Sequence, residues 1–258
     1  MTYCVAIAAQ DGLVFCSDSR TNAGPDILST YSKMHVYNID AERMIVLLSA
    51  GNLATTQAVI AQLDGDLEDA DAESLGTCRK MVEVGNYVSR VSREQQAAAS
   101  DSTADADVDT SASFIVGGQI SGGKPSIYMI YSAGNFISVS EETPYLQIGE
   151  SKYGKPILDR ILRDDTSLED AARCALVSMD STMRANATVG PPVEVLVYEN
   201  DTYESDHYIK LAEEDSYLIT LRRAWSEAIQ AAFLNLPQFE WEKRTALPLH
   251  AVTEEGQP

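Results

Sequence analysis

Short hydrophobic runs separated by turn residues dominate the first fifty positions of the chain. The run Thr2–Ala9 (TYCVAIAA) is rich in strand-forming residues, and Gln10-Asp11-Gly12 separates it from a second run, LVFCS. A turn signal between two such runs predicts an antiparallel hairpin. Two further strands are predicted from Met34 (MHVYNI) and from Met44 (MIVLLSA). The stretch 18–32 is rich in Gly, Asn, Ser and Thr and therefore predicts a loop.

Helical spacing of apolar residues replaces this pattern after Gly51-Asn52. The stretch LATTQAVIAQL predicts a helix, and the acidic run 64–73 predicts an exposed loop or helix end. A stripe of apolar residues predicts a second long helix over 74–99. The polar and acidic stretch 100–109 is then expected to form a loop.

The second half of the chain repeats this order of strands followed by helices. Strands are predicted over SASFIVGGQI, PSIYMIYSA and Tyr145–Ile148, and a helix begins within 149–163. Ser167 and Asp170 have the spacing of a helix cap, which predicts another helix from this point. Two more strands, PVEVLVY and 207–210, precede a final helix over 211–234 and a tail that contains Pro and Trp.

The strands occur as hairpins rather than in alternation with helices. We therefore predict an α+β fold in which two facing sheets are covered by helices on both outer sides. No internal repeat or linker is visible, so residues 1–258 are expected to form one domain, with 211–258 as a C-terminal extension.

Composition narrows the class of protein. The formal net charge of −20 argues against a nucleic-acid partner, because phosphate binding requires clustered Lys and Arg. It is typical of an acidic, soluble bacterial protein, and it would also attract basic substrates. We see no signal peptide and no long apolar run, so no membrane partner is expected. The four cysteines form no CxxC pair, which favours a reduced, cytoplasmic protein without a zinc site. With three scattered histidines, neither a metal nor a cofactor is expected.

Thr2 stands directly behind the initiator methionine and is the first candidate for chemistry. If an aminopeptidase removes Met1, Thr2 carries a hydroxyl and a free α-amine together. The amine has an unperturbed pKa of roughly 8, so it can accept the hydroxyl proton near neutral pH. One residue then supplies both the nucleophile and the general base, and no histidine is needed.

Three further residues offer electrostatic support to Thr2. Strand pairing would bring Asp18, at the end of the second strand, and Lys33, at the start of the next, toward it. A lysine lowers the effective pKa of a nearby hydroxyl, and a carboxylate keeps that lysine charged and oriented. Gly51, after a strand end, offers a backbone N–H to an oxyanion. Taken singly, each also fits a plain structural role, such as a solvated edge lysine or a turn before a helix.

Together, Thr2, SDSR at 17–20, Lys33 and SAGN at 49–52 resemble the pattern of proteasome β-subunits. The predicted element order is similar to the four-layer αββα sandwich of that family, the N-terminal-nucleophile hydrolase fold, over roughly residues 2–200. The segments TYCVAI, SDSRTNAG, QIGESKYGKPILDR and NATVGPPVEVLVY resemble one bacterial branch, Anbu. That branch also has a C-terminal helical extension.

The resemblance implies roles for these positions. Thr2 becomes the nucleophile, Asp18 and Lys33 the charge pair that activates it, and the Gly51 N–H the oxyanion donor. A catalytic serine of the family corresponds to Ser151, although the register also allows Glu150 at that place. The resemblance further implies a substrate cleft whose two walls are formed by Arg20 and Thr21 and by Ala50 and Gly51, where an extended peptide pairs with the backbone.

Besides the turn at 149–151, a second departure from the family pattern bears on function. The family motif Asp-x-x-Ser-Gly-Gly reads Asn186-Ala187-Thr188-Val189-Gly190-Pro191 here, so its acid and its serine are both missing. The resemblance implies a self-assembling threonine-type amidohydrolase or peptidase, in a ring or open helical ring. Two alternatives stay open: a non-catalytic scaffold with a decayed site, and a hydrolase of a non-protein amide conjugate. The sequence does not indicate whether an ATPase partner exists.

The final predicted helix carries an apolar stripe, which either packs on its own domain or contacts another subunit. Its members are Leu218, Leu221, Trp225, Ile229 and Phe233.

Overall fold

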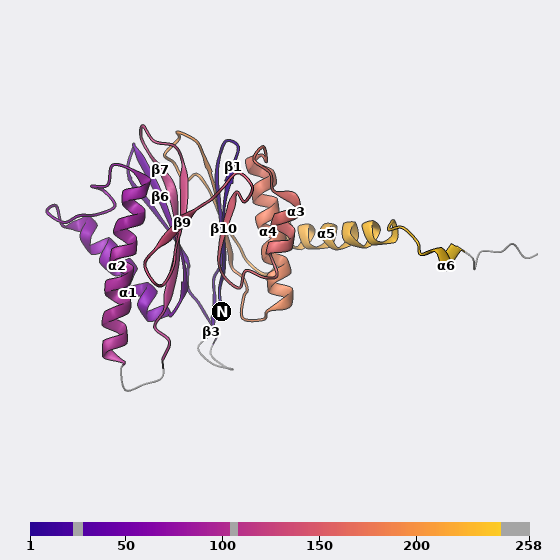
Figure 1. The fold of residues 1–258 in the computed structure, drawn as a ribbon, viewed down its shortest axis with the longest axis horizontal. Coiled ribbons are helices and arrows are strands. Elements are labelled where there is room, and N and C mark those ends of the chain that lie inside the picture. Colours follow the sequence, from indigo (N-terminus) through magenta and orange to yellow (C-terminus); the bar gives the residue numbers. More distant parts are fainter. Residues whose placement is uncertain (23–27, 104–107, 244–258) are drawn as a thin grey trace, which may run out of the picture.

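The computed structural model describes residues 1–22, 28–103 and 108–243. Two five-stranded antiparallel sheets face each other in its centre (Figure 1). The first sheet has the order β10 (Tyr145–Gly149), β1 (Tyr3–Ala9), β2 (Gly12–Asp18), β11 (Val193–Glu199) and β12 (His207–Leu211). The second has the order β5 (Met34–Asp40), β6 (Arg43–Gly51), β7 (Ala112–Ile120), β8 (Ser126–Ile130) and β9 (Phe136–Ser138).

Helices cover the outer face of each sheet. α1 (Leu53–Glu68) and α2 (Met81–Ser102) lie on the second sheet, and α3 (Lys155–Ile161) and α4 (Leu168–Ala185) lie on the first (Figure 1). The layers therefore follow the order helices, sheet, sheet, helices, which confirms the predicted four-layer αββα sandwich.

The alternation of side chains along each strand produces three apolar cores. On β1, Val5 and Ile7 face the α3–α4 layer, whereas Cys4 and Ala6 face the opposing sheet. On β6, Ile45 and Leu47 pack under α1 and α2, while their neighbours join the core between the sheets. Because both faces of both sheets are covered, these strands read as nearly continuous apolar runs.

Strand register brings several chain segments to one end of the sandwich. The β1–β2 hairpin pairs Cys4 with Ser17, which sets the start of β1 beside the end of β2. β10 pairs antiparallel with β1, and Tyr3 lies opposite Gly149. The start of β5 and the end of β6 lie at the same end, where Met34 pairs with Leu48. Every sequence-predicted catalytic residue stands at one of these strand ends or within two positions of it.

The region 18–32 differs from the predicted loop. It contains two short strands, β3 (Arg20–Asn22) and β4 (Leu28–Thr30), which pair with each other as a separate sheet. The ends of this hairpin are fixed where the Tyr31 N–H donates to the Ser19 carbonyl at 3.0 Å. The polar residues Arg20, Thr21, Ser29 and Thr30 hide these strands from a hydrophobicity pattern.

Two further boundaries were predicted wrongly. The second helix begins at Met81 rather than at residue 74, because Ser74 and Thr77 close a turn through mutual backbone and hydroxyl hydrogen bonds. It continues to Ser102, into part of the predicted loop 100–109, of which residues 104–107 lie outside the described chain.

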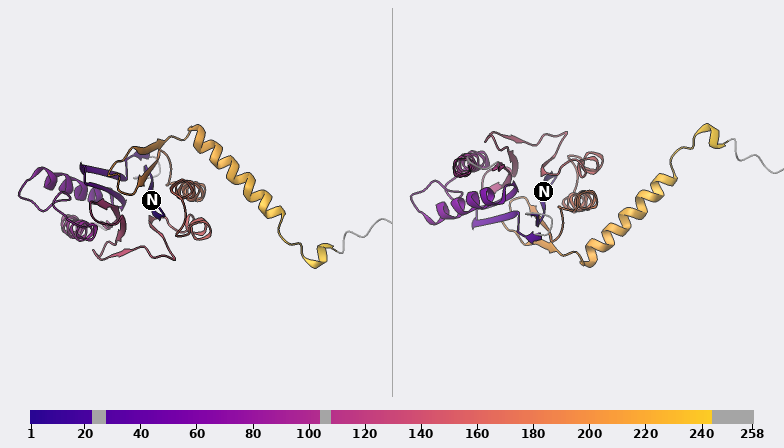
Figure 2. Two further views of the ribbon diagram at one scale, coloured as in Figure 1. Left: turned by 90° about the horizontal axis from the view of Figure 1, so that it is seen from above. Right: turned by 90° about the horizontal axis from the view of Figure 1, so that it is seen from below.

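The last long helix, α5 (Ser216–Leu234), leaves the sandwich beyond α3 and α4 and leads to the short helix α6 (Glu240–Lys243) (Figures 1 and 2). It begins five residues later than predicted, because Leu211 pairs with Val193 in β12 and Asp215 caps the helix. Of its apolar stripe, Leu218 is buried, whereas Phe233 is 70% exposed. Within the described residues, packing on its own domain therefore accounts only for the start of the stripe.

Candidate active site

A cleft of about 890 Å³ opens at the end of the sandwich where these strand ends meet. Thr2, Thr21, Lys33, Ala50 and Gly51 all line it, so the fold gathers five of the eight residues predicted for the site. The cleft continues along one face of α1, which supplies mostly small and apolar side chains. The first residues of the chain, Met1 and Thr2, lie at this cleft.

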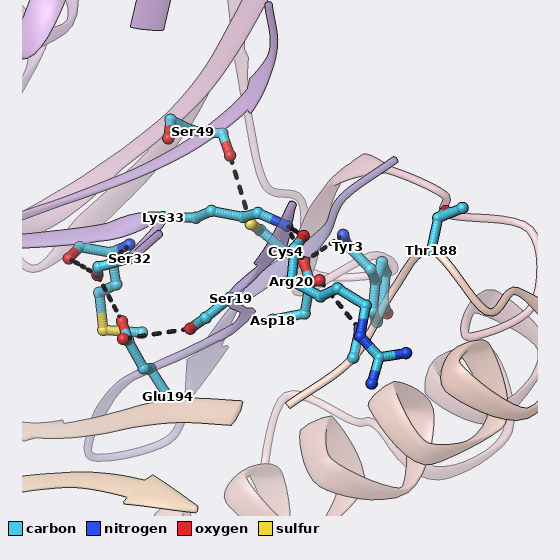
Figure 3. Close-up of polar contacts among 12 residues, drawn as sticks. Tyr3, Cys4, Asp18, Ser19, Arg20, Ser32, Lys33, Ser49, Thr188 and Glu194 are labelled. Carbon is cyan, nitrogen blue, oxygen red and sulfur yellow. Dashed lines mark hydrogen bonds and ion pairs between the residues drawn. The ribbon is translucent and has the colours of Figure 1, made fainter. Parts of the chain in front are cut away.

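A buried ion pair lies beside Thr2. The Lys33 Nζ donates to Asp18 Oδ1 at 2.6 Å and to the Arg20 carbonyl at 2.7 Å (Figure 3). Asp18 is fully buried, and the side chain of Lys33 is only 8% exposed. The backbone N–H of Tyr3 donates to Asp18 Oδ1 at 3.0 Å, and that of Gly190 donates to Oδ2 at 3.1 Å. Asp18 thus links the residue after Thr2, the lysine and the loop before β11.

Two opposing influences act on the pKa of Asp18. Burial, the larger, raises this pKa above its ordinary value, and the nearby Lys33 ammonium and the two backbone N–H groups act to lower it. The ionised carboxylate can accept all of these hydrogen bonds at once, so its charge depends on keeping the donors in place.

The backbone around Thr2 is held by the turn after β10. Glu150 N–H donates to the Thr2 carbonyl at 2.7 Å. Gly149 adopts a φ of +81°, and a Cβ at this position would lie 2.0 Å from the Thr2 carbonyl oxygen. A glycine is therefore required here, both for its backbone conformation and for the close approach to Thr2.

Glu150 and Ser151 are placed differently. The Glu150 side chain is buried, and its Oε2 accepts a hydrogen bond from Asn186 Nδ2 at 3.1 Å. Asn186 Oδ1 in turn accepts from the backbone N–H of Thr188 at 3.0 Å and from its hydroxyl at 2.6 Å. Ser151 is half-buried, and its hydroxyl forms no hydrogen bond to another of the described residues.

This network joins the two places where the chain departs from the family motifs. An acid is absent at position 186 but present at position 150, and the structure brings these two side chains into contact. The sequence offered a signal for it, since Glu150 stands beside the position assigned to the serine. The two positions are 36 residues apart in the sequence, so no local pattern links them.

Of the remaining predicted residues, two line the cleft and one, Arg20, contacts the loop before β11. Thr21 and Ala50 line the cleft, on β3 and β6. The guanidinium of Arg20 turns away from it: Nη1 donates to the Ala187 carbonyl at 2.9 Å, and the side chain lies against Gly190 (Figure 3). What Arg20 offers to the site is its carbonyl, which accepts from Lys33.

Gly51 ends β6 with a φ of +117°, in contact with the backbone of Ser111. The next residue, Asn52, caps α1 by accepting from the Thr55 N–H at 3.2 Å. The chain therefore changes from strand to helix at the wall of the cleft.

In the described part of the chain, no three or more His, Cys, Asp or Glu side chains come together as a metal site would require. Nor does any helix in the described ranges combine the length and the hydrophobicity needed to cross a membrane.

The four-layer fold, and the residues gathered at the end of the sandwich where the cleft opens, define a proteasome-type sandwich. A family model of the proteasome subunit matches residues 2–198, and the chain belongs to this family. Within it, the chain is similar to Anbu (ancestral beta-subunit) from Yersinia bercovieri, with 41% identity over 93% of this chain and 100% of that one, at a TM-score of 0.87. A search of curated protein sequences found no match.

Two further solved structures show the same similarity. Anbu from Hyphomicrobium sp. strain MC1 is 41% identical over 93% of this chain and 100% of that one, with a TM-score of 0.85. The Anbu complex from Pseudomonas aeruginosa, described as a helical assembly, is 46% identical over 92% of this chain and 98% of that one, with a TM-score of 0.87. The predicted resemblance to the Anbu branch is thereby confirmed.

Proposed function

We propose that this protein is a threonine-type N-terminal-nucleophile hydrolase that cleaves peptide or amide bonds. The observation that carries the proposal is the position of Thr2 in the cleft, directly before Tyr3, whose N–H is bonded to the buried Asp18–Lys33 pair. Met1 is 64% exposed at the same cleft, which leaves it accessible to an aminopeptidase. Its removal frees the Thr2 amine.

The reaction then proceeds in two steps. The Thr2 hydroxyl oxygen attacks the substrate carbonyl while its proton passes to the Thr2 amine. The ammonium of Lys33 stabilises the developing negative charge on the hydroxyl oxygen, and the Gly51 N–H stabilises the oxyanion. The proton moves on to the leaving amine as the C–N bond breaks, which leaves an ester on Thr2. Water, deprotonated by the same amine, hydrolyses this ester and restores the hydroxyl.

Substrate binding relies on the backbone at the two walls of the cleft. β3 carries Thr21 on one side, and Ala50 and Gly51 end β6 on the other. An extended peptide between them can form main-chain hydrogen bonds in the manner of an added strand. The small side chains on α1 leave room for a bulky group, so amide conjugates other than proteins also fit this proposal.

We also propose that the protein associates with itself. Beyond the sandwich, α5, α6 and the segment between them expose several large apolar side chains, and such surfaces mark interaction sites. They are Ile229, Phe233, Leu234, Leu236, Phe239 and Trp241. The similar complex from Pseudomonas aeruginosa is a helical assembly. The same surface suits a scaffold, which is the alternative function if Thr2 does not react.

Labelling with an electrophile tests the enzymatic proposal. A peptidyl epoxyketone bonds to a residue that offers a hydroxyl and a free amine together, and intact-mass spectrometry detects the adduct. We expect an adduct on the wild type and none on Thr2→Ala, with Thr202→Ala, an exposed threonine outside the cleft, as a control that still reacts. The absence of an adduct under conditions that label an active proteasome would leave the scaffold as the supported function.

A further inference from the structure

A second buried carboxylate lies near the ion pair and has no part in the mechanism above. Glu194, on β11, is fully buried. It lies opposite Ser17 on β2 and Lys210 on β12, and Leu196, two residues further on, belongs to the core between the sheets. The desolvation penalty of a buried carboxylate can exceed the Coulombic stabilisation from one ion pair. Further contacts of Glu194 must therefore stabilise it in this position.

The Glu194 carboxylate connects two segments that are adjacent to the ion pair. Its Oε1 accepts from the Ser19 hydroxyl at 3.3 Å, and its Oε2 accepts from the Ser32 hydroxyl at 2.7 Å (Figure 3). Ser19 directly follows Asp18, and Ser32 directly precedes Lys33.

The Ser32 hydroxyl has two acceptors within reach but only one proton. Its oxygen lies 2.7 Å from Glu194 Oε2 and 2.8 Å from the Met34 carbonyl. We infer that the Ser32 hydroxyl donates its hydrogen bond to the Glu194 carboxylate, because a charged acceptor forms the stronger hydrogen bond. The Met34 N–H can then donate to the same hydroxyl oxygen at 3.3 Å. This arrangement fixes the residues on both sides of Lys33.

Lys210 contributes differently. Its Nζ lies 3.0 Å from Glu194 Oε1, but its side chain is 45% exposed. A half-exposed ion pair is weak, so it does not explain why the carboxylate is buried. Lys210 balances the charge of Glu194, and the Tyr208 hydroxyl is a further hydrogen-bond partner of the carboxylate. Ser19 and Ser32 connect the carboxylate to the two segments beside the ion pair.

We propose that Glu194 is a positioning residue, which holds Ser19 and Ser32 together and thereby keeps Lys33 within hydrogen-bond distance of Asp18. This inference rests on the proposed function, since the pair it positions is the one that activates Thr2. Glu194 itself does not line the cleft and reaches it only through Ser32, which does. Its effect is therefore on the rate of the covalent step rather than on substrate binding.

Labelling kinetics separate this role from a general effect on stability. With a peptidyl epoxyketone, we expect Glu194→Ala to lower the rate at saturating reagent by about tenfold or more, with unchanged half-saturation, because small displacements of catalytic groups have large effects. Glu194→Gln retains acceptor and donor groups for both serines and should react at a rate close to that of the wild type. Lys210→Met, which breaks only this half-exposed pair, should leave the rate unchanged. Glu199→Gln, on the exposed end of the same strand, is the matched control.

Several results would overturn the inference. The first is a labelling rate in Glu194→Ala equal to that of the wild type. The second is a labelling rate in Glu194→Gln as low as in Glu194→Ala. The third is a loss of labelling rate in Lys210→Met equal to that in Glu194→Ala. If Glu194→Ala does not fold, the double variant Ser19→Ala/Ser32→Ala removes both donors and should show the same loss of rate.

Crystal structures provide a readout that is independent of activity. The distance from Lys33 Nζ to Asp18 Oδ1, 2.6 Å here, should lengthen in Glu194→Ala and stay unchanged in Glu194→Gln. If the wild type forms no adduct, the proposed function fails, and this distance then decides on the positioning role alone. An unchanged distance in Glu194→Ala would overturn that role.

Discussion

Replacing Lys33 by Met tests whether the buried ion pair is as closely coupled as its geometry indicates. The substitution retains most of the volume of the side chain but leaves the Asp18 carboxylate fully buried without its ammonium. Removing one partner of a buried pair typically costs about 3–5 kcal/mol. For a protein of this size, each kcal/mol corresponds to about 2–4 °C, so the melting temperature should fall by roughly 6–20 °C at pH 7.5.

Thermal unfolding by circular dichroism measures this change. Arg173→Met is the matched control, because its pair with Asp170 is exposed on both sides, at 56% and 59%, and should have little effect. Because burial already raises the pKa of Asp18, the carboxyl can take up a proton once Lys33 is gone. The difference in melting temperature between the wild type and Lys33→Met should therefore become smaller as the pH falls toward 5. A fall in Lys33→Met no larger than in Arg173→Met would refute the reasoning.

Three further predictions concern other parts of the chain. Gly149→Ala should destabilise the protein by at least about 1–2 kcal/mol and abolish electrophile labelling, because of its positive φ and its contact with Thr2, whereas Gly65→Ala, with open space around it, should stabilise. Burial lowers the pKa of His35, so the folded state binds a proton less readily than the unfolded state. The free energy of unfolding, measured with denaturant, should therefore fall as the pH drops below about 6.5. The fall should be smaller in His35→Gln. An equal fall in both proteins would contradict this. Phe233→Ser/Leu234→Ser should reduce the particle size seen by analytical ultracentrifugation without lowering the melting temperature of the sandwich, and an unchanged size would place the assembly contact elsewhere.

Much of the sandwich could be predicted because its strands and helices have distinct periodicities. The β1–β2 hairpin and the ends of β5 and β6 follow from local patterns. Asp18 and Lys33 could be placed near Thr2 because each stands at a strand end, and paired strands bring their ends together. The boundaries failed where polar side chains decide the conformation, as in the turn between Ser74 and Thr77.

Contacts that depend on tertiary register could not be predicted in this way. Glu194 lies 162 positions from Ser32 and 175 from Ser19, and neither distance has a periodicity to reveal it. The one local signal was an acid inside the apolar strand PVEVLVY. The orientation of the Arg20 side chain, which points to Ala187 and not into the cleft, likewise depends on a loop distant in sequence.

The surface on which α5 packs is a third feature that could not be predicted from the sequence. Its apolar stripe is compatible with packing on its own chain or on another, since both bury the same residues. Only Leu218 of the stripe is fully buried by the described part of the chain, close to the ion pair between Arg222 and Asp180. Periodicity indicates that a helix has an apolar face but not which surface covers it.

The measurement that tests the central claim most directly is tandem mass spectrometry of the N-terminal peptide after labelling with a peptidyl epoxyketone. It identifies, in the same molecules, the residue that carries the adduct and the residue at which the chain begins. We expect every labelled chain to begin at Thr2 and to carry the adduct there. An adduct on chains that still begin with Met1, or on a residue other than Thr2, would contradict it.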